Sequence, residues 1–290
     1  METVELESPP SLPPLYARVL GASLLPGGDG ELPGKRLLVR GVGIAADHVA
    51  AYGRVCGFGL RSAAPATYPH VLAFPLHLSL MTERSFPFSA LGLLHIENRI
   101  EALAPLPVGG SVDLAVWAEG LRDHERGRQF DVLAEAELDG EVAWRERSTY
   151  LRLEKSKGGS SGERERRGSP AEFEATAEWT IPGDIGRRYA AVSGDRNPIH
   201  MHPLLARAFG APTTIAHGMW TTARSLAAFE GWTPDAFTLE TEFKSALRIP
   251  GKATLRSRRE AGGFGFRVES PDAERAYVLG RLTGSGAGGR

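Results

Sequence analysis

Five polar residues lie close together in the second half of this 290-residue chain: Ser193, Asp195, Asn197, His200 and His202. Gly194 is typical of the position just after a helix, and Pro198 keeps the residue before it out of the helical region. The sequence therefore predicts a helix end followed by a tight turn, which can direct Asp195 and His200 into one pocket. An acid and a base placed in this way indicate general acid–base chemistry.

Farther along the chain, the sequence Ile-Ala-His-Gly ends at Gly218 and leads into an apolar run from Trp220 to Phe229. This pattern favours a helix that begins near Gly218. The free N–H groups at a helix N-terminus favour a developing negative charge, and glycine lets a ligand approach the backbone. Gly218 is therefore a candidate oxyanion donor. His217 and Met219 beside it are candidate substrate contacts, although Met219 also suits the core of the helix.

Together, Ser-Gly-Asp-x-Asn-Pro-Ile-His starting at Ser193 and Ile-Ala-His-Gly-Met ending at Met219 resemble the hydratase 2 motif of the MaoC-like dehydratases. Those proteins are (R)-specific enoyl-thioester hydratases or 3-hydroxyacyl-thioester dehydratases of fatty-acid metabolism with the hotdog fold. The resemblance implies that Asp195 and His200 activate a water molecule and that the N–H of Gly218 binds the thioester carbonyl. Ser193 and Asn197 would then lie near the substrate. It requires no cofactor and no metal ion.

Each of these residues also has a structural explanation of its own. An aspartate beside glycine is common in turns, so Asp195 could serve the turn alone, and His200 could be a buried structural histidine. Ser193 could be a packing residue. His202 points away from His200 if the segment between them is extended. A zinc site made of these two histidines and His217 is not expected, because no Cys or Glu completes a set at familiar spacing.

Basic residues near the motif are candidates for binding the carrier of a thioester, either coenzyme A or an acyl carrier protein. Coenzyme A needs cations near its phosphates, and an acyl carrier protein needs a basic surface. The candidates are Arg196, Lys244 and Arg248. Arg196 departs from the aromatic residue often found at this place in the family motif.

The composition is ordinary for a soluble globular protein. Hydrophobic residues make up 42% of the chain, charged residues 24%, and the formal net charge is −1, so neither nucleic acid nor an anionic membrane is an expected partner. The single Cys56 fits a reducing compartment. The N-terminus is acidic and proline-rich where a signal peptide is basic and apolar. We expect a cytoplasmic protein, with a homodimer possible.

The chain contains an internal repeat on either side of a stretch rich in charged residues, Gly and Ser, over 154–170, which is typical of an exposed linker. Residues 44–57 align with 181–194, and residues 96–107 align with 239–250. Such a repeat predicts two similar units. The hotdog resemblance makes each unit an antiparallel sheet around a central helix, and the fold class α+β, a double hotdog.

The expected domain limits follow from this division. Residues 1–34 form an N-terminal arm, irregular except for one possible helix, and 35–153 form a first hotdog unit. Residues 171–284 form a second unit that carries the motif, and 285–290 a flexible tail. The strands are expected at 36–44, 111–118, 130–138 and 142–153, and again at 173–181, 253–259, 264–270 and 276–283. The central helices are expected near 76–83 and from Gly218.

The same alignment predicts that the first unit lacks the chemistry. It places Phe58 opposite Asp195, Ala63 opposite His200, and Phe74-Pro75 opposite His217-Gly218. One active site per chain is therefore expected, and the first unit would supply the wall of an acyl pocket. A hotdog thioesterase, which would direct water at the thioester carbonyl, and a subunit that only binds acyl chains are the two alternatives.

Overall fold

The computed structural model describes residues 1–22, 30–154, 173–208 and 211–284. Two elements precede the repeat, β1 (Glu2–Leu6) and α1 (Leu12–Ala22). The first half contains β2 (Lys35–Gly43), α2 (Ala46–Cys56), α3 (Tyr68–Met81), β3 (Leu93–Ala102), β4 (Ser111–His124), β5 (Gly127–Leu138) and β6 (Glu141–Leu153). The second half contains β7 (Glu174–Ile181), α4 (Ile185–Ser193), α5 (Pro198–Met201), α6 (Pro203–Ala208), α7 (Gly218–Ala228), β8 (Phe237–Phe243), β9 (Gly251–Glu260), β10 (Gly263–Glu269) and β11 (Ala276–Gly284).

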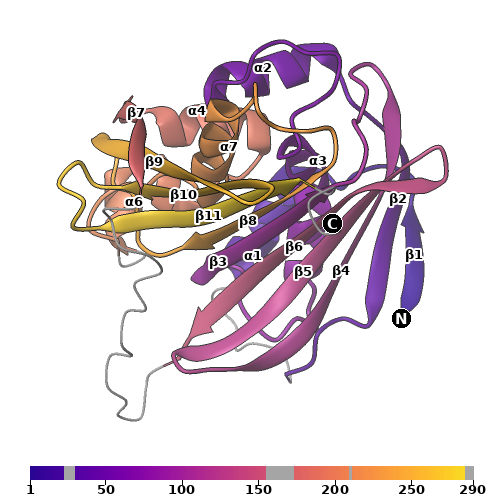
Figure 1. The fold of residues 1–290 in the computed structure, drawn as a ribbon. Coiled ribbons are helices and arrows are strands. Elements are labelled where there is room, and N and C mark those ends of the chain that lie inside the picture. The colour runs from indigo at the N-terminus through magenta and orange to yellow at the C-terminus, as the bar shows by residue number, and fades with distance from the viewer. Residues whose placement is uncertain (23–29, 155–172, 209–210, 285–290) are drawn as a thin grey trace.

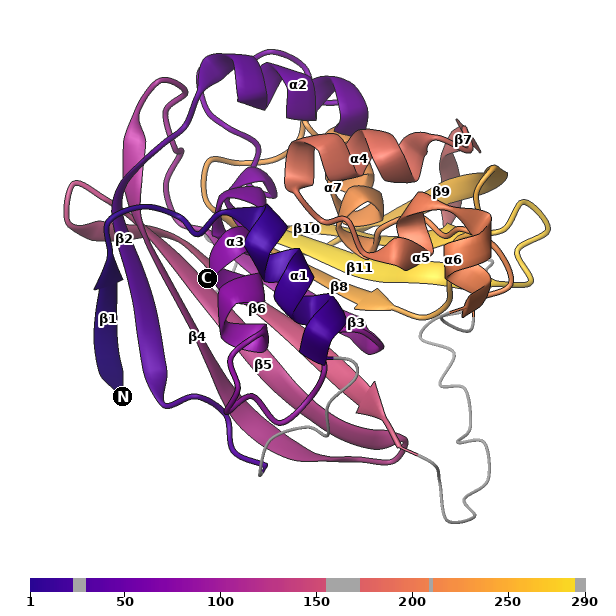
Figure 2. The same ribbon diagram turned by 180° about the vertical axis from the view of Figure 1, so that it is seen from behind.

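The strands of both halves form one continuous sheet, and the helices cover one face of it (Figures 1 and 2). The order is β1-β2-β4-β5-β6-β3-β8-β11-β10-β9-β7. Apart from β1, it reads the same from both ends, because β3 and β8 pair in antiparallel fashion at the centre with Ile100 opposite Leu239. This arrangement confirms the predicted α+β fold, with two similar units placed side by side.

Apolar residues determine which face of the sheet meets the helices. In β5 the buried residues Phe130, Val132, Ala134 and Ala136 alternate with less buried ones, as a strand with a single core-facing side requires. Helix α3 is buried along most of its length, which is why its sequence shows no polar face. The core joins both halves, since buried side chains of α3, α7 and the sheet form one cluster.

The repeat is visible in local detail. Helices α2 and α4 both end at a glycine in the left-handed conformation, with φ of 89° at Gly57 and 76° at Gly194. A glycine adopts this conformation without the steric cost that other residues incur. The next residue is Phe58 in the first half and Asp195 in the second, so these two positions are equivalent, as the sequence predicted.

The alignment of the two central helices was wrong. Helix α3 begins at Tyr68, not near Leu76, and Pro75 lies about two turns inside it. The residues equivalent to His217 and Gly218 are therefore Thr67 and Tyr68, each pair lying where its helix begins. The error arose because the alignment was carried back from residues 96–107 and 239–250, and the stretch from the start of α3 to β3, residues 68–93, is longer than the stretch from the start of α7 to β8, residues 218–237.

The N-terminal arm is more regular than expected. Strand β1 pairs in parallel with β2, with Glu2 opposite Lys35. Helix α1 packs on α3 through Leu15 and Val19 in a small separate core cluster with Phe74 and Leu78. The predicted linker, apart from Glu154, and the predicted tail lie outside the described residues. Within the described part of the chain, no helix is long and apolar enough to cross a membrane.

Candidate active site

A cavity of about 310 Å³ lies between the two halves. The second half contributes Asp195, His200 and Gly218 to its lining, and the first half contributes side chains of α3, β3 and α1. Ser193, Asn197, His217, Met219 and Lys244 also line it. Most of the residues predicted from the motif therefore meet at one cavity, although they come from several short elements.

Asp195 is held by the backbone turn that follows α4. Its Oδ1 accepts a hydrogen bond from the N–H of Asn197 at 3.0 Å, and its own N–H donates to Ser193 Oγ at 3.1 Å. Asn197 also caps α5, because its side-chain oxygen accepts from the N–H of Ile199. Ser193 and Asn197 thus have clear structural duties in placing Asp195, in addition to lining the cavity.

His200 is buried, and only one of its ring nitrogens is committed to the protein. Nδ1 lies 2.8 Å from the carbonyl oxygen of Ile215, which accepts its hydrogen bond. Burial lowers the pKa of His200 below its usual 6.5, although Asp195 opposes this shift. The neutral ring therefore carries its proton on Nδ1, and Nε2 is the nitrogen that can accept a proton.

His217 supports both catalytic candidates. Its ring stacks on His200 with centroids 3.7 Å apart, and its Nε2 lies 3.0 Å from the backbone oxygen of Asp195. Burial and the neighbouring His200 lower its pKa to about 3, so the ring is neutral and Nε2 donates to that oxygen. Nε2 is also 3.8 Å from Asp195 Oδ2. His217, predicted as a substrate contact, therefore also fixes the loop that carries the acid.

The carboxylate of Asp195 is the charged member of this group. Burial would raise its pKa, but the nearby His217 and His200 and the N–H of Asn197 outweigh burial, and the pKa is lower than usual. The proton-binding atoms of Asp195, His200 and His217 all lie within 4.8 Å of one another. An ionised acid beside a neutral imidazole is the pairing that a proton relay needs.

Gly218 is the first residue of α7, so its N–H has no partner within the helix. A Cβ at this position would lie 2.7 Å from Cε1 of Phe243, which also lines the cavity. Glycine is therefore required by close packing against an aromatic ring. Met219 is 4% exposed and still borders the cavity, so it belongs both to the core and to the wall.

Only one of the three predicted carrier-binding residues borders the cavity. Lys244 lies in its wall and pairs with Glu242, whereas Arg196 and Arg248 are exposed and do not line it. The backbone N–H of Arg196 instead donates to the hydroxyl of Tyr16 at 2.6 Å. A basic residue missed by the sequence reasoning, Arg126 of the β4–β5 turn, also lines the cavity.

Tyr16 and His70 are among the polar residues of the cavity that the sequence did not predict. The hydroxyl of Tyr16 donates to the carbonyl of Gly194 at 2.8 Å, which ties α1 to the loop of Asp195. His70 lies on α3, within a stretch that is otherwise mainly apolar. A histidine in such a stretch was the available signal, but nothing in the sequence connected it with Asp195.

Two groups of side chains could hold a metal ion by the chemistry of their donors: Asp195, His200 and His217, and a second group of His70, His77 and Glu146. In the first group, His200 Nδ1 and His217 Nε2 already bond to backbone oxygens. A metal ion there would have to use the other ring nitrogens. The expectation of a metal-free site remains a prediction.

Comparison with known proteins places this site in a family. Residues 165–247 match the family model described as MaoC like domain. The chain is 36% identical over 240 residues to 3-hydroxyacyl-thioester dehydratase X of Mycobacterium tuberculosis, covering 83% of this chain and 86% of that protein. It is also 30% identical to 3-hydroxyacyl-thioester dehydratase Y of the same organism, over 66% of this chain and 72% of that protein.

Solved structures agree with this relationship. A crystal structure of HtdX of Mycobacterium tuberculosis has a TM-score of 0.77 and 34% identity, covering 86% of this chain and 99% of that one. A conserved hypothetical protein of Mycobacterium tuberculosis described as having a double hotdog fold has a TM-score of 0.52 and 14% identity, covering 83% of this chain and 92% of that one. That likeness concerns the fold alone. The chain belongs to the MaoC-like dehydratase family and has the double hotdog fold.

Proposed function

We propose that this protein is a (3R)-hydroxyacyl-thioester dehydratase, which in reverse is an (R)-specific trans-2-enoyl-thioester hydratase. The relatives described as 3-hydroxyacyl-thioester dehydratases support the reaction and the thioester class of substrate. A further relative, 32% identical over 160 residues, is the enoyl-CoA hydratase ChsH3 of Mycobacterium tuberculosis. The observation that carries the proposal is the meeting of Asp195, His200 and the start of α7 in one cavity.

In the dehydration direction, the proton that leaves C2 of the acyl chain is passed through the relay to the hydroxyl on C3, which leaves as water, so the enzyme gains and loses no proton overall. The neutral His200 accepts a proton through Nε2, and its fixed Nδ1–H keeps the ring in the required tautomer. The ionised Asp195 shares the same proton relay and orients the departing or entering water. Because both groups lie on one side of the cavity, water is lost from one face of the substrate.

Removal of the C2 proton places negative charge on the thioester oxygen. The free N–H of Gly218, at the N-terminus of α7, is the proposed donor to that oxygen. The helix end favours such a charge. Loss of one donor of this kind typically reduces the rate about 10²–10³-fold.

The carrier end of the substrate would meet a basic rim. Lys244 and Arg126 both border the cavity and both have exposed side chains. They come from different halves and could contact the phosphates of coenzyme A or of the phosphopantetheine of an acyl carrier protein. A twofold or larger rise in KM for a coenzyme A substrate in Arg126→Ala, with kcat unchanged, would support this placement.

The proposed reaction is tested by following the absorbance of the conjugated enoyl thioester with crotonyl-coenzyme A and longer trans-2-enoyl substrates, on coenzyme A and on acyl carrier protein. Loss of the band, formation of the (3R)-hydroxy product and absence of free thiol are the expected results. Release of free thiol would show a thioesterase instead. No turnover of the enoyl thioester on either carrier would favour the alternative that the protein only binds acyl chains.

A further inference from the structure

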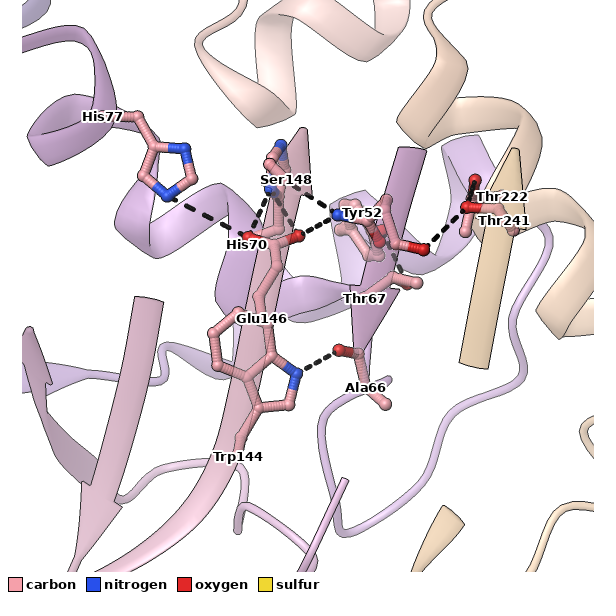
Figure 3. A network of polar contacts seen from close by, with 11 residues as sticks. Tyr52, Ala66, Thr67, His70, His77, Trp144, Glu146, Ser148, Thr222 and Thr241 are labelled. Atoms are coloured by element: carbon pink, nitrogen blue, oxygen red, sulfur yellow. Dashed lines mark hydrogen bonds and ion pairs between the residues drawn. The ribbon is translucent and has the colours of Figure 1, made fainter. Parts of the chain in front are cut away.

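A second buried polar cluster lies in the half without the motif. Glu146 of β6 is fully buried, and both of its carboxylate oxygens lie 2.9 Å from Nδ1 of His70 on α3. Its Oε1 also accepts from Nδ2 of Asn98 at 2.6 Å. Figure 3 shows Glu146 between His70 and His77, whose Nε2 is 4.0 Å from Oε2. A buried carboxylate requires such partners. The contact between its oxygens and Nδ1 fixes the orientation of the His70 ring.

Glu146 and His70 each favour the charged form of the other. Burial would raise the pKa of Glu146, but His70, His77 and Asn98 outweigh burial and lower it to about 2. Burial would likewise lower the pKa of His70, yet Glu146 reverses the effect and raises it. Both shifts favour the state in which Glu146 is a carboxylate and His70 an imidazolium. This contrasts with His200, whose ring is neutral.

Of this cluster, His70 reaches the cavity that holds Asp195, whereas Glu146 and His77 do not line it. His70 is 6% exposed. Because Nδ1 is held by Glu146, Nε2 is the nitrogen that remains for the cavity, and in the protonated ring that Glu146 favours it carries an N–H donor. One turn farther along α3, Phe74 lies against Gly194, since a Cβ there would be 3.7 Å from Phe74 Cδ1. This face of α3 therefore lies beside the loop that carries Asp195.

An N–H donor that faces a cavity without a hydrogen-bond partner is costly unless a bound molecule offers it an oxygen. The methylene groups of an acyl chain cannot do so, and the apolar residues Leu78 and Met81 farther along the same face suit them better. The oxygen that the proposed reaction brings next to Asp195 is the one that joins or leaves C3. It is the acceptor that matches a fixed N–H beside this loop.

We propose that His70, held by Glu146, donates its Nε2–H to the C3 oxygen of the substrate, as hydroxyl or as water, from the half of the molecule that lacks the motif. This inference rests on the proposed function. It makes the first half a contributor of a polar contact to the reaction, in addition to an apolar wall. It also accounts for a buried charged pair that the family motif does not include.

The test uses two substitutions that separate the two nitrogens of His70. His70→Asn keeps an amide near the position of Nδ1, where it can still bond Glu146, but it cannot reach the cavity. His70→Gln places its amide near Nε2 and keeps a donor for the cavity. His77→Asn is the matched control, because His77 lies on the same helix beside Glu146 but does not line the cavity.

Two measurements decide the outcome, both on the full-length protein. The first is kcat/KM for each variant with the carrier that wild type accepts. The second is the dissociation constant of a 3-hydroxyacyl thioester and of the saturated acyl thioester of equal length, each measured in the His200→Ala background to prevent turnover. The comparison isolates the contact with the C3 oxygen, because the two thioesters differ only there.

We expect His70→Asn to reduce kcat/KM about tenfold or more. It should also raise the dissociation constant of the hydroxyacyl thioester about tenfold, as for loss of one charged hydrogen bond, and leave that of the saturated thioester unchanged. His70→Gln should recover part of both effects, and His77→Asn should show neither. Equal weakening of the two thioesters, or unchanged kinetics in His70→Asn, would overturn the proposal. If His70→Asn does not fold, His70→Gln compared with His70→Leu decides it by the same ratio. Wild-type turnover tests the proposed function independently.

Discussion

The two halves of the molecule contain related cavities, and only one of them has the groups for chemistry. The second cavity, of about 540 Å³, is lined by α2, the connection before α3, the start of α3 and the end of α7. Those elements are the counterparts of α4, the connection before α7, the start of α7 and α3 around the catalytic cavity. The repeat has thus preserved the cavity in both places.

The two halves differ at the positions equivalent to Asp195 and to the start of α7. Phe58 follows the end of α2 where Asp195 follows the end of α4. Helix α3 begins at Tyr68, the equivalent of Gly218, and the N–H of Tyr68 already donates to the carbonyl oxygen of Pro65 at 2.7 Å. The hotdog unit therefore supplies the space, and the long connection before α7 carries the proposed acid and base, Asp195 and His200.

The largest effect should come from the acid and the base themselves. Asp195→Asn and His200→Ala should each reduce kcat/KM by about 10³–10⁴-fold, because each removes one half of the proton relay. The equivalent change in the first half, Phe58→Leu, should leave kcat/KM within about twofold. Steady-state kinetics on the preferred enoyl thioester, with circular dichroism to verify folding, measures all three. Comparable losses in Phe58→Leu would mean that the second cavity takes part in turnover.

Gly218→Ala should have the next largest effect, a loss of about 10–10²-fold in kcat. The added Cβ would lie 2.7 Å from the ring of Phe243, so the start of α7 or the ring must move. The N–H of residue 218 would then no longer point at the thioester oxygen. Gly231→Ala is the matched control just after the end of α7, since a Cβ there meets nothing within 4 Å. A full rate in Gly218→Ala would remove the oxyanion role from this backbone group.

The pH dependence should distinguish the histidines of the two halves. His200 must be neutral to accept a proton, and its pKa lies below 6.5, so kcat/KM should decline only at a pH lower than that value. Asp195 must be ionised, and its lowered pKa keeps it so across the same range. The pKa of His70 is shifted in the opposite direction, upward, by the neighbouring Glu146. Kinetics between about pH 5 and 8, with unfolding midpoints at each pH as the control, tests this. An acid limb centred above pH 6.5 would contradict the neutral His200.

The catalytic loop could be predicted from sequence because its chemistry is local. Asp195, Asn197 and His200 lie within one turn, and Gly194 and Pro198 mark that turn by well-understood backbone preferences. Eight strands of the described structure were equally accessible, because burial on one side imposes an alternating pattern, whereas β1 and the two central strands, β3 and β8, were not predicted. Even the equivalence of Phe58 and Asp195 followed from the glycine that ends each preceding helix.

What could not be predicted depends on contacts between distant residues. Helix α3 shows no amphipathic pattern, because it is buried on nearly all sides, so its start and the place of Pro75 were misjudged. His70 and Glu146 are 76 positions apart in the chain and meet only through the packing of α3 on the sheet. Tyr16 reaches Gly194 from the N-terminal arm, 178 positions away. Spacing in the sequence carries no trace of such pairs.

The smallest expected effect comes from filling the second cavity, which is lined by α2 and the end of α7. Ala50 lines that cavity from α2, and Ala90 lines the catalytic cavity beside the cluster of α1 and α3. Ala50→Phe should leave kcat/KM within about twofold for every chain length, whereas Ala90→Phe should spare crotonyl thioesters and reduce turnover of longer ones about tenfold, because the ring occupies the space proposed for the acyl chain.

Both variants replace an alanine by phenylalanine, so a difference in their kinetics reflects which cavity is filled and not the kind of substitution. The measurement is kcat/KM against acyl chain length for the two variants and wild type. If Ala50→Phe is the variant that loses the longer substrates, the acyl chain runs into the second cavity and the two cavities share one substrate. If only Ala90→Phe does, the first half serves the reaction through α1 and α3 alone, and its own cavity persists because the sheet and helices of a hotdog unit enclose it whether or not it is used.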